Sequence, residues 1–246
     1  MSVNEKSGLG ITHPTWQQAK DALRLHLASF IPAQVVTLTP EMCVRARDDE
    51  NFGQIITEAA IVVCDGVGVA WGESRLSGER PDKIPGIDLA DWALEEVDRI
   101  AGRVYLLGAT DETVRITAEK IQNEYPRLTV AGFHDGYFDQ SEEEEIVKTV
   151  VEANPHLLLV GLGSPKQEIF ISCHLTDLRC GVAMGIGGSF DVWSGNVRRA
   201  PAFFRATGTE WLYRILSQPG ARLRRLPVLL RFIGMVLNES GARLRE

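Results

Sequence analysis

The sequence lacks the patterns typical of disulfide-stabilised, membrane-spanning and metal-binding proteins. Its four cysteines form no C-x-x-C pair, and we expect no disulfides. No apolar run approaches the roughly 20 residues of a spanning helix, and the N-terminus shows no signal-peptide core. There is no D-x-D carboxylate pair and no His/Cys cluster at ligand spacing, which argues against a bound divalent metal. We therefore expect a cytoplasmic protein without a metal or other cofactor.

Lysine is absent from the last part of the chain, and this exposes an asymmetry of charge. Residues 198–246 contain ten arginines and three acids, a balance of +7, although the whole chain carries −7. The first 197 residues therefore carry −14. This division predicts an acidic globular domain over 1–197 and a basic helical appendage over 198–246 that meets an anionic partner.

Short apolar runs alternate with amphipathic stretches along the first 197 residues. The runs are typical of strands buried on both faces, and they lie at 34–38, 59–64, 103–107, 128–133, 157–160 and 180–186. Most of them end in glycine or a small polar residue. The pattern predicts an α/β fold with roughly six parallel strands in a doubly wound sheet.

The turn after the fifth run has the most informative local sequence. Gly161 and Gly163 follow a strand directly, and a helix-compatible segment begins after Pro165. Ligands of open parallel sheets bind at such turns, where glycine admits a phosphate and the helix start favours an anion. A plain strand-to-helix turn remains an equal alternative, because G-x-G is a weak signal.

Other strand ends place polar groups at the same edge of the sheet. Thr37 and Thr39 end the first strand, and Thr39 precedes Pro40 as a helix N-cap would. Capping alone would explain them equally well. Asp65 follows 59–64 and is either a cap or a catalytic base. The Gly- and Pro-rich segment 75–88 has the character of a lid or binding loop.

The position of the central glycine turn and the residues after it argue against two common classes of nucleotide-binding protein. The central turn lies too late in the chain for a dinucleotide fingerprint, and no Walker G-K-[ST] follows it. A metal-free diphosphate site, one well-placed carboxylate and many arginines favour glycosyl transfer from a UDP-sugar. In the appendage, arginines alternate with bulky apolar residues, as in a membrane-surface helix or a helix packed on the sheet.

Nine short segments, taken together, resemble one known family. In chain order they are VTLTPEM (36–42), DGVG (65–68), PGIDL (85–89), LLG (106–108), DGYF (135–138), VGLGSPKQE (160–168), GIGGSFD (185–191), RAP (199–201) and EWLYR (210–214). The chain resembles the bacterial WecG/TagA/CpsF glycosyltransferases. The resemblance implies a Rossmann-like domain whose C-terminal appendage docks on the membrane and completes the active site. It also implies transfer of an N-acetylmannosamine-type sugar to polyprenol-diphosphate-linked N-acetylglucosamine.

The resemblance also implies roles for particular residues. Asp65 matches the family's catalytic base, and Thr37 and Gln167 match polar residues that line the reaction site. The positions that match the UDP pocket are Gly108, Gly136, Tyr137, Gly163 and Asp191. Those that match the diphosphate-binding arginines of the appendage are Arg214, Arg222 and Arg224.

Two residues in the substrate-binding set depart from the family pattern. Thr39 stands where the family usually has asparagine, and Lys83 where it often has arginine. A changed hydrogen-bonding set can change which sugar is accepted. We expect a metal-independent inverting transferase that acts at the cytoplasmic face of the membrane. We expect no nucleic-acid partner, and the sequence leaves a homo-oligomer possible. The alternative is a non-catalytic nucleotide-sugar-binding scaffold of a polysaccharide assembly complex.

Overall fold

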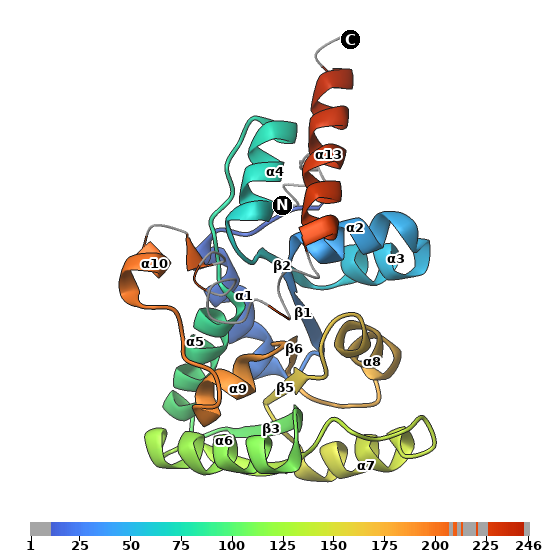
Figure 1. Cartoon of the computed structure of the whole chain (residues 1–246). Helices are drawn as coiled ribbons and strands as arrows, with labels where there is room; N and C mark the ends of the chain where they lie inside the picture. The colour runs from blue at the N-terminus through green and yellow to red at the C-terminus, as the bar shows by residue number, and fades with distance from the viewer. Residues whose placement is uncertain (1–10, 207–208, 211–212, 214–219, 221–225, 244–246) are drawn as a thin grey trace.

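The computed structural model has one six-stranded parallel sheet at its centre (Figure 1). The structure describes residues 11–206, 209–210, 213, 220 and 226–243. The strands are β1 (Ala33–Leu38), β2 (Ile61–Cys64), β3 (Arg103–Gly108), β4 (Thr129–His134), β5 (Leu157–Gly161) and β6 (Val182–Gly185). They lie in the order β2-β1-β6-β5-β3-β4, with every neighbouring pair parallel. The predicted α/β fold is confirmed.

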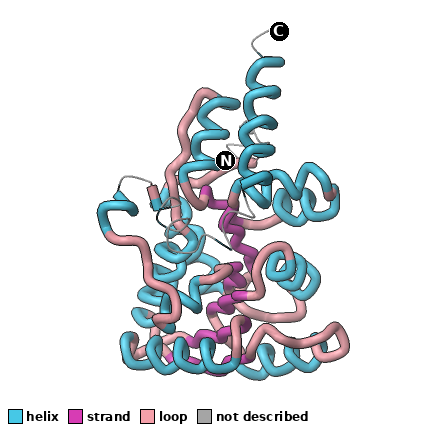
Figure 2. Tube along the Cα trace, in the orientation of Figure 1, coloured by secondary structure: helices cyan, strands magenta, loops and turns pink. Residues whose placement is uncertain are grey.

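Helices cover both faces of the sheet (Figures 1 and 2). One face carries α1 (Trp16–Ser29), α5 (Gly86–Arg99), α6 (Asp111–Glu124) and α9 (Ser189–Ser194). The other carries α2 (Pro40–Asp48), α3 (Glu50–Glu58), α4 (Val67–Ser77), α7 (Glu143–Ala153), α8 (Lys166–His174) and α13 (Leu226–Arg243). A short helix, α10 (Ala202–Ala206), follows α9.

Five strands of the sheet are almost fully buried because they are apolar on both faces, whereas the edge strand β4 has no buried residue. Along β5, Leu157 and Leu159 pack with α1, α5 and α6, whereas Leu158 and Val160 pack with α7 and α8. This alternation follows the two-residue repeat of a strand. Unbroken apolar runs therefore predict the strands correctly, since helices cover both faces.

The chain order places the strand ends that matter side by side. The first two strands run from the middle toward one edge, β3 and β4 run toward the other, and β5 and β6 fill the centre. All six strands are parallel, so their carboxyl ends lie along the same side of the sheet, which we call its carboxyl edge. In such sheets, ligands bind outside this edge where the strand order reverses.

Helix α13 packs one side on the main domain. Phe232 and Val236 are fully buried among residues of α2, α3 and α4. Arg231 donates two hydrogen bonds of 2.5 Å to the carboxylate of Asp48 on α2, and Arg47 pairs with Glu239. The sequence predicts either a membrane-surface helix or a helix packed on the domain for the appendage. Residues 226–243 form a helix that is packed on the domain.

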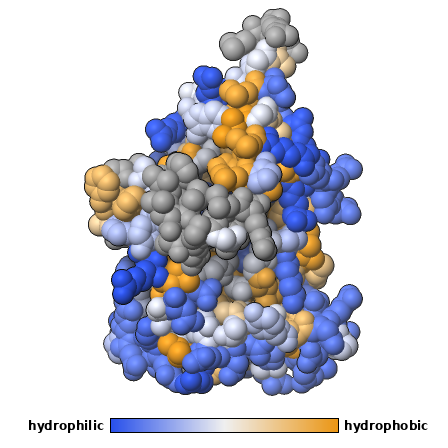
Figure 3. Space-filling view, viewed as in Figure 1, coloured by the Kyte–Doolittle hydropathy of each residue, from blue (hydrophilic) through white to orange (hydrophobic). Residues whose placement is uncertain are grey.

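Apolar side chains also remain on the outside of the same helix. Leu230 is 67% exposed and Leu237 46% exposed, and Figure 3 shows apolar surface running along α13. No helix within the described ranges is long and apolar enough to span a membrane.

We expect Phe232→Ala to lower the free energy of unfolding by about 3 kcal/mol, because it leaves a cavity between α13 and α4. Urea unfolding followed by circular dichroism measures this change. Leu230→Ala on the same helix is the control, and we expect less than about 0.5 kcal/mol because that side chain is largely exposed. Equal effects of the two substitutions would show that α13 does not contribute its packing to global stability.

Candidate functional site

Two residues predicted for the reaction site meet at the end of β6. The Thr37 hydroxyl on β1 donates to the Gly185 carbonyl at 3.3 Å. A Cβ on Gly185 would lie 2.6 Å from the Gln167 amide nitrogen, so Gln167 packs directly on this glycine. Thr37 is 7% exposed and Gln167 3% exposed. The sheet thus brings together two residues that are 130 positions apart in the chain.

The Gln167 side chain is fixed by groups on both sides. Its Oε1 accepts a hydrogen bond from the Gly187 amide at 3.0 Å, and its Nε2 donates to Glu168 Oε1 at 2.6 Å. The backbone carbonyl of Glu168 accepts from Gln34 Nε2 on β1 at 3.0 Å. Burial raises the pKa of the Glu168 carboxyl, and hydrogen bonds from Gln167 and Ser164 oppose that shift.

Asp65, Thr39 and Lys83 lie around the adjoining ends of β1 and β2. Cys64 pairs with Leu38, and the Asp65 amide donates to the Leu38 carbonyl at 2.9 Å. Residues 75–77 belong to α4 and residues 86–88 to α5, so the loop predicted over 75–88 spans only 78–85. Its Lys83 forms a parallel bridge with Cys64, which brings the loop back beside β2. This loop leads into α5, where a Cβ on Gly86 would lie 2.9 Å from the Thr37 methyl carbon.

The structure shows which of Thr39 and Asp65 caps a helix. The Thr39 hydroxyl accepts from the Met42 amide at 3.4 Å, so Thr39 is the predicted N-cap of α2. Helix α4 has Gly66 as its N-cap and no side-chain cap. Asp65 is therefore not the cap of α4, and the capping alternative does not account for it.

Three of the glycine turns predicted for the nucleotide meet at the ends of β3, β4 and β5. A Cβ on Gly108 would lie 2.5 Å from the Gly161 carbonyl carbon, and Gly108 has φ +134°. A Cβ on Gly136 would lie 3.2 Å from the Gly108 Cα and 3.0 Å from a methyl of Leu162. The Gly136 amide donates to the Ala109 carbonyl at 2.8 Å. Gly163 follows in the turn after β5, where its carbonyl accepts from the backbone N–H of Gln167 at 2.9 Å.

Tyr137 and Asp191 lie at the margins of this group. Tyr137 is 80% exposed, and its amide donates to the Asp135 carboxylate at 2.7 Å. Asp191, on α9, follows the β6 turn, and its backbone carbonyl accepts from the Val197 amide at 2.9 Å. Arg214, Arg222 and Arg224 lie outside the described residues, so their predicted roles stay predictions.

Helix starts add positive potential at this edge of the sheet. Within the described part of the chain, α4, α5 and α8 begin without a side-chain cap. Their first N–H groups and macrodipoles favour an anion. By contrast, Thr39 and Thr110 cap α2 and α6.

The chain toward the appendage is anchored beside the same edge. Arg199 pairs with Asp88 in the first turn of α5 and lies 3.5 Å from Asp91. The Trp193 indole donates to Asp91 at 2.8 Å, and burial raises the pKa of the Asp91 carboxyl. Arg199, near the predicted start of the appendage, is therefore held on α5.

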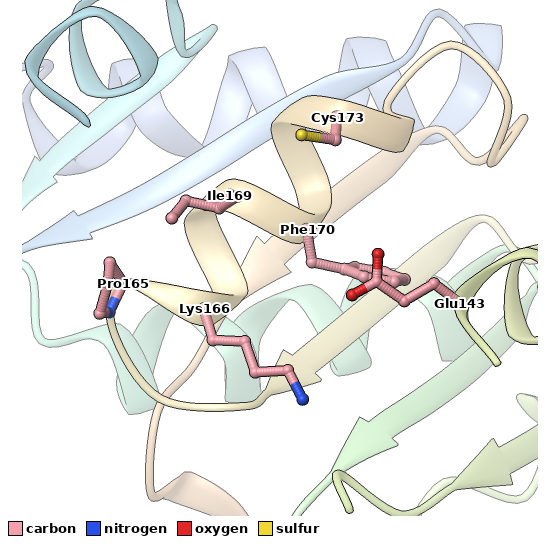
Figure 4. Close-up of a pocket in the computed structure, with 6 residues that line it drawn as sticks. All are labelled: Glu143, Pro165, Lys166, Ile169, Phe170 and Cys173. Carbon is pink, nitrogen blue, oxygen red and sulfur yellow. The ribbon is translucent and has the colours of Figure 1, made fainter. Parts of the chain in front are cut away.

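Two pockets are lined by other residues, and one of them adjoins the start of α8, where Lys166 Nζ lies 3.5 Å from the Gly136 carbonyl oxygen. One of about 280 Å³ follows the face of α8 that carries Lys166, Ile169, Phe170 and Cys173, with Glu143 opposite (Figure 4). The other, of about 490 Å³, lies between α2, α3 and α13. Neither contains a predicted site residue. Among the described residues, no group of three or more His, Cys, Asp or Glu side chains could hold a metal ion.

The fold and the site define a parallel α/β protein that can hold an anionic ligand and has a carboxylate at a strand end. The chain belongs to the glycosyl transferase WecG/TagA/CpsF family, whose model matches residues 5–246. The family resemblance predicted from the motifs is confirmed.

Two curated relatives show the same similarity. An N-acetylglucosaminyldiphosphoundecaprenol N-acetyl-beta-D-mannosaminyltransferase of Bacillus spizizenii is 33% identical over 210 residues, covering 85% of this chain and 80% of the relative. An enzyme of the same name from Staphylococcus aureus strain MW2 is 36% identical over 198 residues, covering 80% and 77%.

The sequence reasoning missed three contributors to the site. Glu168, Gly185 and Arg199 all lie in motifs that carry the family resemblance, but the sequence gives none of them a role of its own. A buried acid next to a site residue has no distinct local signal, because Lys166-Gln167-Glu168 also suits an exposed helix start. The contact of Gly185 with Thr37 arises from the pairing of β6 with β1, whereas Arg199 pairs with Asp88 on α5 and Glu168 contacts its neighbour Gln167.

We expect Gly108→Ala to destabilise the protein by about 3 kcal/mol, because the new Cβ adds overpacking to a positive φ. Gly78→Ala is the matched control, since Gly78 has φ +82° but nothing within 4 Å of its Cβ position. It should cost only about 1 kcal/mol. Thermal and urea unfolding measure both. A Gly108 variant no less stable than the Gly78 variant would contradict the close backbone approach.

Proposed function

We propose that this protein is a metal-independent inverting glycosyltransferase. It moves an N-acetylmannosamine-type sugar from a UDP-sugar to N-acetylglucosamine linked to polyprenol diphosphate, for a cell-surface polysaccharide. The observation that carries the proposal is the meeting of Thr37 and Gln167 on Gly185, between the Asp65 strand end and the glycine cluster. The names of the two relatives support the sugar and the acceptor.

The donor diphosphate would bind along the glycine turns. Gly163 has nothing within 4 Å of its Cβ position, so the backbone there is open to a phosphate, and the start of α8 favours its charge. Gly108 and Gly136 let the neighbouring turns pack closely beside it. The sugar would then lie toward β6 and β1, where Gln167 and Thr37 present an amide and a hydroxyl.

In the reaction, Asp65 acts as the base. The acceptor hydroxyl oxygen bonds to the anomeric carbon while its proton passes to the Asp65 carboxylate. The bond from the anomeric carbon to the diphosphate oxygen breaks, and UDP leaves with the electron pair. A single displacement of this kind inverts the anomeric centre. Lys83 beside Cys64 adds a cation near the same strand end.

The departing charge would be stabilised by helix starts and by arginines of the appendage rather than by a metal. Arginine is suited to a diphosphate because its charge is permanent and its donors form a fork. We assign this role to Arg214, Arg222 and Arg224 from the family resemblance. Arg199 would hold the start of the segment that carries them.

The appendage would also bring the enzyme to its lipid-linked acceptor. Basic residues near an anionic membrane contribute about 1 kcal/mol each, whereas the acidic domain is repelled. The outward leucines of α13, Leu230 and Leu237, would add apolar burial in the headgroup region. The protein would thus act peripherally at the cytoplasmic face.

A non-catalytic scaffold that binds nucleotide sugar is the second candidate, favoured by the departures at Thr39 and Lys83. It would need the glycine turns but not the carboxylate. A transfer assay with UDP-N-acetylmannosamine and a short-chain polyprenol-diphosphate-N-acetylglucosamine analogue separates the two, because a scaffold would bind the donor without turnover.

We expect Asp65→Asn to lower kcat by about 100-fold or more, the scale of a lost general base, while UDP affinity stays within about twofold. The transfer assay measures the first and titration calorimetry the second. Asp21→Asn, on the exposed surface of α1, is the control and should match the wild type. Near-normal turnover of Asp65→Asn would remove Asp65 from the mechanism.

Transfer should continue at an unchanged rate in excess EDTA, since the proposed charge stabilisation comes from arginines and helix starts. Initial rates with EDTA, and with EDTA followed by Mg²⁺ or Mn²⁺, test this. A rate that disappears with chelator and returns with either ion would overturn the metal-independent mechanism and leave the proposed substrates unaffected.

A further inference from the structure

Glu168 is a buried acid next to a site residue, and the proposed chemistry gives it no part. It is 2% exposed, and its Oε2 has no hydrogen-bond partner among the described residues. A buried carboxyl with an unpartnered oxygen is costly, and an apolar side chain at this position of α8 would avoid the cost. Packing alone therefore does not explain why an acid is buried at this position.

The contact of greatest consequence is the one with Gln167. An amide side chain can be turned by half a rotation, which exchanges its acceptor and its donor. The Gly187 amide can only donate, so Gln167 must place Oε1 toward it, at 3.0 Å. Glu168 Oε1 then receives the Nε2 group at 2.6 Å.

These two hydrogen bonds fix the positions of Oε1 and Nε2 in the Gln167 side chain. An ionised carboxylate can only accept, so an ionised Glu168 would face the amide oxygen of Gln167 if that side chain turned over. One of the two Nε2 hydrogens is used by Glu168, and the other is left for the region around Gly185, where Thr37 also donates.

The acid itself is held by its surroundings. Its backbone carbonyl accepts from Gln34 Nε2 on β1 at 3.0 Å, which ties the first turn of α8 to the sheet. Its carboxyl Oε1 accepts from Gln167 Nε2 in a site where the whole side chain is buried. Glu168 is thus a fixed acceptor, and it can fix another side chain in turn.

We propose that Glu168 is a positioning residue for Gln167, which holds the amide in the one orientation that directs an N–H toward the sugar site. The proposal rests on the proposed glycosyl transfer. Glu168 acts through Gln167 and does not touch substrate. Its removal should affect the reaction only while Gln167 is present.

Three substitutions at Glu168 separate positioning from packing. Glu168→Gln retains an oxygen that can accept from Gln167, Glu168→Asp withdraws it by one methylene, and Glu168→Met removes it while nearly keeping the volume. We expect kcat to fall about tenfold in the Asp and Met variants, the size of one lost hydrogen bond in a transition state, and within about threefold in the Gln variant. KM for the UDP-sugar should change less than kcat.

A double-mutant cycle with Gln167→Ala provides the decisive comparison. In the Gln167→Ala background, Glu168→Asp and Glu168→Met should each lower kcat less than about twofold. If they lower it as much as in the wild type, Glu168 acts through the fold and the proposal is wrong. It is also wrong if the Gln variant is less active than the Asp variant. Should Glu168→Met fail to fold, Glu168→Asp carries the same comparison.

A control substitution tests for general effects of a buried acid. Glu96 on α5 is 5% exposed and pairs with Arg99 and Arg24, away from the site. Glu96→Met should lower stability and leave kcat unchanged. A loss of kcat comparable with Glu168→Met would overturn the proposal.

An NMR measurement tests the inference without any turnover. The side-chain amide of Gln167, assigned by its loss in Gln167→Ala, should have a hydrogen-bonded Nε2 proton in the wild type and in Glu168→Gln. That proton should move toward the position of solvent-exposed amides in the Asp and Met variants. An unchanged resonance overturns the positioning role. A wild type that shows this signal but transfers no sugar would contradict the proposed function and leave the positioning role in place.

Discussion

The close approach of backbones at the carboxyl edge of the sheet is the constraint on which the site depends. Gly108 and Gly161 come so near that a Cβ on Gly108 would overlap the Gly161 backbone, and a Cβ on Gly185 would overlap Gln167. The parallel order imposes this, because β3, β5 and β6 deliver their turns side by side. Only residues without a Cβ leave room there for the neighbouring backbone and for the Gln167 side chain.

The polar side chains at this edge are linked rather than independent. Gly187, Gln167 and Glu168 form one connected set of hydrogen bonds, and the hydrogen bond from Thr37 to Gly185 lies beside it, because Gly185 packs on Gln167. In a buried network, each group restricts the orientation of the next, so a substitution at one position acts on its neighbours. This makes the site sensitive to residues that would never contact a substrate.

The appendage is joined to the domain at its beginning and along α13. Arg199 pairs with Asp88 at the start, and Phe232 and Val236 pack between α2 and α4 further on. Charge composition alone suggested a separable basic segment. The packing shows that part of it contributes to the hydrophobic core, and the division at residue 198 stays a prediction.

The sequence by itself determined the α/β class, the strand positions and the family. Unbroken apolar runs have one stable solution, a parallel sheet covered on both faces, and the motifs sit at its strand ends. Local pattern could not decide between cap and base for Asp65, nor reveal Glu168, Gly185 or Arg199 as members of the site. The tertiary structure excludes Asp65 as the cap of α4, and its role as a base stays a proposal. It also shows the contacts of Gly185 with Thr37 and of Arg199 with Asp88, which join segments that are distant in the chain. Glu168 contacts its neighbour Gln167, and only its burial could not be read from the local sequence. The sheet order β2-β1-β6-β5-β3-β4 brings Thr37 and Gly185 together through backbone pairing that leaves no trace in the local sequence.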